Sequence, residues 1–264
     1  LDPGFVVFER GQAKRVARWG DVDEAPKTYR YADLSSRSGE TATIDYGEDP
    51  PRVFVGSRVR LADLGLRPRA GRPRFLPVPS LAEPRGLELF LSLGDEGALP
   101  GGPADARFRV TGILQRSLRA GGERFTWEEY LLHEPAEGFR WLVVSDGHWN
   151  VVEPVEPGLV DLDERGGATY RGEVFRPLST GTARVEWAAG ELPWEAAVGD
   201  TSEVADFVRA PHVLSREAGE DEITWSLGTW VPPDAVARAF GKRVLPKPLG
   251  RAPNQPKKPP APKR

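Results

Sequence analysis

Hydrophobic residues occur along this chain in short runs, and turn residues interrupt them about every ten positions. The runs are rich in Val, Ile, Phe and Trp, and the 29 glycines and 26 prolines leave little room for long helices. Short runs with this spacing are typical of antiparallel sandwiches and barrels. The predicted strands lie at 5–8, 41–46, 52–56, 107–114, 124–132, 139–145, 148–152, 183–190 and 222–231.

One segment, "PPDAVARAFG" at 232–241, has the pattern of a helix. Pro233 or Asp234 can begin it, Val236 and Phe240 share a face, and Gly241 ends it. The predicted fold class is therefore all-β, mainly antiparallel, sandwich-like or barrel-like, with one or two short helices.

Three short patches recur at a nearly constant distance, which predicts an internal duplication. Their offsets are 169, 173 and 172 residues. We therefore expect residues 1–65 to be the closing half of a first β unit and residues 107–240 a complete second unit; chance similarity between β-rich segments is the alternative. The paired patches are "GQAKRV" (11–16) with "GTARV" (181–185), "YADL" (31–34) with "VADF" (204–207), and "GSRV" (56–59) with "GTWV" (228–231).

Two basic stretches lie outside these units. The Pro-, Arg- and Gly-rich connection 66–106 begins within "GLRPRAGRPRFLPVPS" (65–80), which has four arginines and no acid. We interpret it as a proline-stiffened linker, with contact to phosphate or an anionic surface as the alternative. The tail 241–264 has eight Lys or Arg residues and no acid, and is expected to run extended and mostly solvated.

Composition narrows the chemistry that the chain can perform. It has no cysteine, which excludes disulfides, thiolate catalysis and cysteine-bound zinc. His133, His148 and His212 lack the paired spacing of a metal site, so neither a metal nor another cofactor is expected. A net charge of −3 argues against overall attraction to nucleic acid, and no apolar run approaches the ~20 residues of a membrane span.

The segment "WLVVSDGHWN" at 141–150 is the densest group of chemically interesting residues. Asp146-Gly147 between two β-type runs predicts a hairpin with a type I′ turn. Alternation then places Leu142, Val144, Trp149 and Val151 on a core face, and Ser145, His148 and Asn150 on the other. The expected cross-strand pairs are Ser145 with His148, Val144 with Trp149, Val143 with Asn150, Leu142 with Val151 and Trp141 with Val152.

A hydrolytic site at this turn is the catalytic alternative. Ser145, Asp146 and His148 would all lie at one tip, where the order of a triad is hard to build. The weak catalytic candidates are His148, Asp146 and Glu129, and we favour no catalysis.

Seven tryptophans crowd between positions 127 and 230. Tryptophans commonly fill small β cores, but several lining a groove would suit a stacked base, a sugar or a proline-rich peptide. The ligand-binding candidates are Trp127, Tyr130, Trp141, Trp194 and Trp230.

The ordered motifs of residues 107–240 resemble the bacterial domain of unknown function 4178 (DUF4178) family. They are Trp127-x-Glu129-Tyr130, the Asp-Gly-His-Trp hairpin, "GELPW" (190–194), "ADF" (205–207) and "LSRE" (214–217). Residues 29–66 are similar to the closing half of a preceding copy in two-copy members. The resemblance implies a β-rich module without an established activity; relatives often carry zinc ribbons and membrane helices, and are linked by gene neighbourhood to envelope stress and polyamines.

We therefore expect a non-enzymatic binding or adaptor module, the soluble part of a membrane- or envelope-stress-associated bacterial protein. It would lie in the cytoplasm, at the inner face of the cell membrane. Its partner would be another protein, or the membrane surface through the basic tail. The alternatives are a hydrolase-type enzyme that uses His148 with a nearby carboxylate, and a nucleic-acid or polyamine binder.

Overall fold

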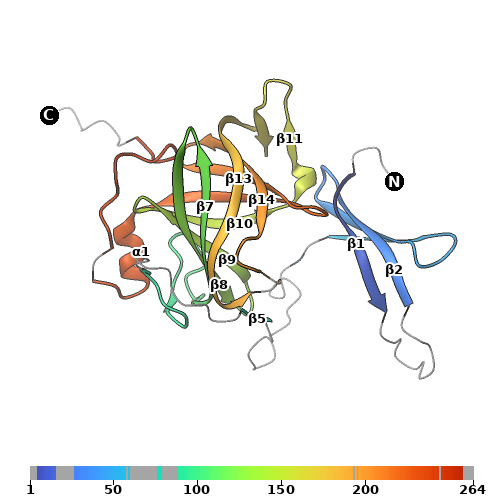
Figure 1. Cartoon of the computed structure of the whole chain (residues 1–264), viewed down its shortest axis with the longest axis horizontal. Helices are drawn as coiled ribbons and strands as arrows, with labels where there is room; N and C mark the ends of the chain where they lie inside the picture. The colour runs from blue at the N-terminus through green and yellow to red at the C-terminus, as the bar shows by residue number, and fades with distance from the viewer. Residues whose placement is uncertain are drawn as a thin grey trace.

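The computed structural model describes residues 5–15, 27–57, 59, 76–78, 89–192, 194, 196–243 and 245–257, which form two β-sheets, one 3₁₀ turn and one α-helix (Figure 1). The predicted all-β, mainly antiparallel class is confirmed. Most of the predicted linker 65–80 lies outside the described residues, except β5 (Leu76–Val78), which pairs with β13.

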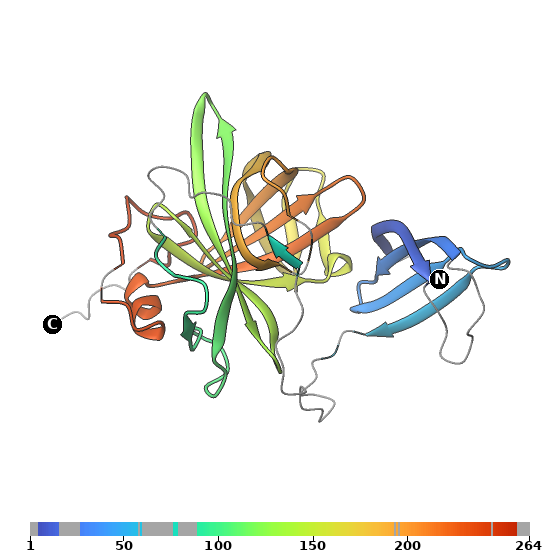
Figure 2. The same cartoon turned by 60° about the horizontal axis from the view of Figure 1, so that its bottom comes forward.

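Eight strands of the larger sheet close into an antiparallel barrel (Figures 1 and 2). The order is β7-β8-β9-β10-β16-β15-β14-β13, and β13 pairs with β7 to complete the circle. The strands are β7 (Phe108–Ala120), β8 (Glu123–Glu134), β9 (Gly138–Ser145), β10 (His148–Val155), β13 (Glu173–Leu192), β14 (Thr201–Arg209), β15 (His212–Ala218) and β16 (Ile223–Val231).

Strand β13 is 20 residues long and changes partner along its length. Its residues Arg176–Arg184 pair with β14, and Arg184–Gly190 pair with β7. Register shifts after Pro177 and after Val185 bend the strand, as bulges do. Pairing with β14 therefore ends, and pairing with β7 begins, at Arg184.

One outer face of the barrel is covered by the segment before β7 and by the C-terminal helix. The helix α1 (Pro233–Ala239) lies where the sequence predicted it. Val236 and Phe240 join a core cluster with Leu91 and Trp149, while β6 (Glu96–Gly97) pairs with the start of β7. Leu91 is fully buried, so the end of the predicted connection 66–106 packs into the core.

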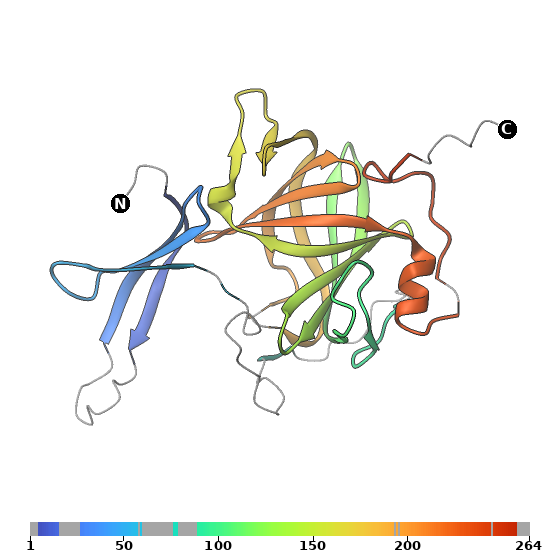
Figure 3. The same cartoon turned by 180° about the vertical axis from the view of Figure 1, so that it is seen from behind.

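A second apolar cluster lies over β14, β15 and β16. It contains Phe207, Leu214 and Trp225, and Tyr170 packs onto it. Tyr170 comes from a small antiparallel pair that follows β10 in the chain (Figure 3). That segment comprises η1 (Pro157–Leu159), β11 (Val160–Leu162) and β12 (Ala168–Tyr170).

The Asp146-Gly147 hairpin is confirmed residue by residue. Ser145 pairs with His148, and the other four predicted pairs follow in register. Asp146 and Gly147 have φ of 50° and 75°, as a type I′ turn requires. Leu142, Val144 and Trp149 are buried, and Val151 packs against the same core.

The smaller sheet repeats four strands of the barrel. Its strands β1 (Val6–Arg15), β2 (Lys27–Ser35), β3 (Glu40–Asp45) and β4 (Arg52–Ser57) pair in chain order, as β13, β14, β15 and β16 do.

The register of the two sets also agrees. Ala32 pairs with Ile44 as Ala205 pairs with Arg216, and Ala42 pairs with Val55 as Leu214 pairs with Leu227. The register shift between Val7 and Glu9 corresponds to that between Pro177 and Ser179. This agreement supports the duplication; that residues 1–65 are the closing half of a first unit stays a prediction.

The small sheet meets the barrel at a few points, on the side of η1 and the β15–β16 turn (Figure 1). The Arg10 amide donates to the Asp221 carbonyl at 2.9 Å. Arg37 lies 2.7 Å from Asp161, and both of these side chains are exposed.

The C-terminal segment 245–257 has no helix or strand and most of its side chains are exposed, as the sequence predicted, but three buried residues anchor it to the barrel. Leu245, Ala252 and Asn254 are buried. The Asn254 side-chain amide donates to Asn150 Oδ1 at 2.7 Å and to the Pro211 carbonyl at 3.1 Å, which joins β10 to the β14–β15 turn. Proline prevents this segment from entering a sheet, but its side chains and carbonyls still find partners on the barrel end.

Candidate functional site

The catalytic candidates of the hairpin are held by the C-terminal segment rather than by one another. His148 is buried, and its Nε2 lies 3.2 Å from the Leu249 carbonyl oxygen. The carbonyl of Asp146 accepts the Leu249 amide at 2.8 Å. Within the described residues no hydrogen bond or ion pair joins His148 to Asp146 or to Glu129.

Glu129 belongs to an ion-paired cluster inside the barrel, the Arg116 clamp (Arg116, Glu129, Ser202 and Glu217). Arg116 on β7 donates to both carboxylate oxygens of Glu217 on β15, at 2.6 and 2.9 Å. It also donates to Ser202 Oγ at 2.7 Å and lies 3.4 Å from Glu129. Strands β13 and β14 separate β7 from β15 in the barrel, so these side chains meet across its interior.

Burial and the contacts with Arg116 shift the pKa values of the two glutamates in the clamp. Arg116 is 9% and Glu129 14% exposed, and burial raises the pKa of Glu129 even though Arg116 lies beside it. Burial also opposes the ionised form of Glu217, but its hydrogen bonds from Arg116 outweigh burial and lower its pKa. The Glu217 carboxylate is therefore the principal counterion of Arg116.

Glu129 also contacts Trp127 within this cluster. Its Oε1 already accepts the Trp127 indole N–H at 2.6 Å as well as the Arg116 contact. One carboxylate oxygen of Glu129 therefore has two partners inside the barrel.

The aromatic candidates lie on two different faces. The register places Trp127, Trp141 and Trp230 on the same face as Glu129, toward the interior of the barrel. Trp194, 43% exposed, packs on Trp141 with ring centroids 5.5 Å apart. Tyr130 lies on the opposite face, fully buried, where its hydroxyl accepts the Phe90 amide and its ring stacks on Trp149.

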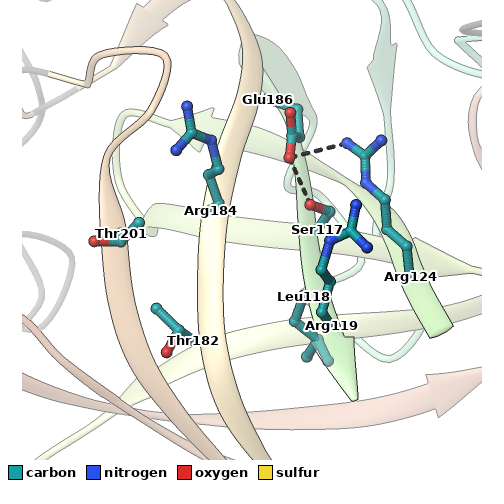
Figure 4. Close-up of a pocket in the computed structure, with 8 residues that line it drawn as sticks. All are labelled: Ser117, Leu118, Arg119, Arg124, Thr182, Arg184, Glu186 and Thr201. Atoms are coloured by element: carbon teal, nitrogen blue, oxygen red, sulfur yellow. Dashed lines mark hydrogen bonds and ion pairs between the residues drawn. The ribbon is translucent and has the colours of Figure 1, made fainter. Parts of the chain in front are cut away.

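A pocket opens where β7 and β13 separate, and we call it the fork pocket. It has a volume of about 580 Å³. Arg184 stands at the branch, since it pairs with Ser117 of β7 and with Thr201 of β14. Figure 4 shows the lining residues, which are Ser117, Leu118, Arg119 and Arg124 of the β7–β8 hairpin, Thr182, Arg184 and Glu186 of β13, and Thr201 of β14.

The lining carries three arginines against one glutamate, a surplus of two positive charges in a chain of net charge −3. Glu186 accepts the Ser117 hydroxyl at 2.6 Å and pairs with Arg124 at 2.9 Å. These contacts, the Ser117 hydrogen bond first, lower the pKa of Glu186 and keep it ionised. Arg119 and Arg184 form no hydrogen bond or ion pair with another residue of the described chain.

The sequence reasoning missed both the clamp and the fork pocket. A signal for the clamp was present, because Arg116 follows Leu114 at the spacing of one strand face within a largely apolar run. The fork pocket had no such local signal, because it depends on the point along β13, at Arg184, where pairing changes from β14 to β7.

Among the described residues, no group of three or more His, Cys, Asp or Glu side chains could hold a metal ion. No helix of the described chain is both long and apolar enough to cross a membrane.

Comparison with known proteins assigns the barrel. Residues 104–233, which contain β7 through β16, match the sequence model of the family described as "Domain of unknown function (DUF4178)". No curated protein and no solved structure matches the chain. The order of motifs from Trp127 to Glu217 had indicated this family, and the match confirms it. Residues 104–233 therefore form a DUF4178 domain, which here is the eight-stranded barrel.

Proposed function

We propose that the chain is a non-enzymatic binding module whose ligand occupies the fork pocket. The observation that carries this proposal is the composition of the pocket: free guanidinium groups and hydroxyls surround it, while the described lining holds no histidine or other free base beside a nucleophile. The candidate acid–base residues are engaged elsewhere, His148 with Leu249 and Glu129 in the Arg116 clamp.

Capture of small molecules tests this proposal. The purified chain is incubated with a small-molecule extract of bacterial cells, separated by rapid gel filtration, and the retained compounds are measured by mass spectrometry. We expect a compound to be retained by the wild type, released unchanged, and lost from an Arg119→Gln/Arg184→Gln variant. Conversion of the compound during incubation would instead support the hydrolase alternative.

His148→Ala is the control for catalysis. Because His148 contacts only a backbone carbonyl through Nε2, the variant is expected to retain the captured compound. Loss of retention in a variant with an unchanged circular dichroism spectrum would contradict the placement of the ligand in the fork pocket.

Attachment to an anionic membrane surface is a second candidate function, which the display of basic residues on the C-terminal segment supports. Arg243, Lys247, Arg251 and Lys257 are exposed, whereas Leu245 and Asn254 between them are buried. The basic side chains are thus presented from an anchored segment. Each contributes about 1 kcal/mol of attraction near anionic lipid. This would place the chain at the inner face of a bacterial cell membrane, as the sequence suggested.

Charge substitution tests the membrane candidate better than deletion, since deletion would also remove the buried Asn254. We expect Lys247→Gln/Arg251→Gln/Lys257→Gln to reduce co-sedimentation with phosphatidylglycerol vesicles at low salt. Equal sedimentation of variant and wild type would rule out lipid contact through this segment.

A further inference from the structure

The Arg116 clamp and the fork pocket share strands β7, β8 and β14, where their polar residues occupy alternating positions. Arg116 points into the barrel and its neighbour Ser117 lines the pocket; Ser202 points in and Thr201 lines the pocket. On β13 the buried Ala183 alternates with Arg184. The interior ion pairs therefore fix the backbone that presents the pocket.

The free charges of the pocket are all positive. Glu186, its single acid, is already neutralised by Arg124 and hydrogen-bonded by Ser117. Glu203 lies just outside the lining and accepts the Thr182 hydroxyl at 2.7 Å. Even when Glu203 is counted, one positive charge remains in excess.

The arginines come from different strands and line one pocket. In Figure 4, Arg184 lies on one side of Glu186, and Arg119 and Arg124 lie on the other. Guanidinium groups from two sides suit an anion with several acceptor oxygens, because each group can donate two parallel hydrogen bonds. A phosphate dianion offers such acceptors on all sides, whereas a carboxylate offers one edge.

From this geometry we propose that the fork pocket binds a phosphate monoester, with Arg119 and Arg184 as its principal ligands and the Thr201 hydroxyl as a further donor. This inference rests on the proposed binding function and names its ligand class. The volume of about 580 Å³ fits a small soluble molecule. A phospholipid headgroup shares the phosphate chemistry, and the experiment separates the two sources.

Titration of the whole chain tests the ligand class. Inorganic phosphate and glycerol 3-phosphate are titrated by calorimetry and by NMR of the Ser117, Arg184 and Thr201 amides, with acetate at equal ionic strength as the monoanion. We expect saturable phosphate binding and at least a tenfold weaker affinity in Arg119→Gln/Arg184→Gln. Arg176→Gln is the matched control, since it removes an exposed arginine of the same strand outside the pocket.

Three results would overturn the inference: no saturable binding, equal losses in the Arg176 control and the pocket variant, or equal affinity for acetate. Sedimentation with phosphatidylglycerol vesicles that depends on Arg119 and Arg184, without binding of soluble phosphates, would assign the site to lipid and likewise reject the monoester. If phosphate does not bind but extract capture still finds a compound that needs the two arginines, the binding function stands and only the ligand class fails.

Discussion

Arg116 stabilises the barrel interior by charge, through its contacts with Glu217, Glu129 and Ser202. Removing it would leave Glu129 buried without a cation. We expect Arg116→Met to lower the free energy of unfolding by about 2–4 kcal/mol, because breaking a buried pair costs more than the pair contributes. Urea denaturation measures this, and Arg116→Met/Glu129→Gln should recover part of the loss; no recovery would show that Glu129 is not the group left uncompensated.

The two glutamates of the clamp should respond oppositely to pH. The pKa of Glu217 lies below its ordinary 4.5 in the folded chain, so its contribution is present above pH 4.5 and is lost as the pH falls below that value. The pKa of Glu129 is raised by burial, so its ionisation costs stability as the pH rises above 4.5.

Glu217→Gln should therefore cost stability at pH 7, about 1 kcal/mol because the side chain is 39% exposed, and the difference from wild type should shrink below pH 4.5. Glu129→Gln should cost less than Glu217→Gln at pH 7. Denaturation curves at pH 4 and pH 7 measure both losses. A larger loss for Glu129→Gln than for Glu217→Gln at pH 7 would refute the assignment of Glu217 as the main counterion.

The turn glycine Gly147 is constrained twice. Its φ of 75° strains any β-branched residue, and a Cβ there would lie 3.0 Å from the Lys247 carbonyl oxygen. Gly147→Val is expected to destabilise the chain by about 1–3 kcal/mol. Gly122 shares the positive φ but has open space around it, so Gly122→Val measures the strain alone. Equal losses would mean that the C-terminal segment does not hold the hairpin.

At the scale of elements, strand β4 leaves the edge of the small sheet apolar. Val53, Phe54 and Val55 are 50%, 55% and 62% exposed, and exposed apolar edge strands promote intermolecular pairing. Val55→Lys should reduce light scattering on heating, because a lysine on an edge opposes strand addition. Val174→Lys, at an equally exposed valine of β13, is the control and should change scattering less.

Local patterns predicted many of the elements but not strands β2, β14 and β15, and they did not predict the long-range contacts. The hairpin followed from Asp146-Gly147, and helix α1 from Pro233 and Gly241, because turn and cap residues act within a few positions. His148 and Leu249 are 101 residues apart in the sequence, and no pattern near His148 predicts their contact. The Arg116 clamp likewise could not be predicted, because Glu217 lies beside Arg116 only when the strands close into a barrel.

At the scale of the whole molecule, the barrel closes with its own strands and the small sheet does not. The small sheet has a core of Ala32, Leu34 and Ala42 with a few partly buried neighbours, and two unclosed edges. Residues 89–257 are therefore expected to unfold cooperatively without residues 5–57, with a melting temperature close to that of the whole chain. Residues 5–57 alone should lack a cooperative transition in circular dichroism, and a sharp transition there would show an independent fold.

The register shift that β1 and β13 share has a consequence for tracing the ancestry of such chains. Its flanking residues differ, Val7 and Glu9 in one strand and Pro177 and Ser179 in the other, yet the extra residue falls at the same step of the ladder. On the predicted duplication, backbone geometry is kept at this step while side-chain identity is not. Homologous units should be sought by aligning ladders, since such a comparison pairs 6–57 with 176–229 where the family match covers only 104–233.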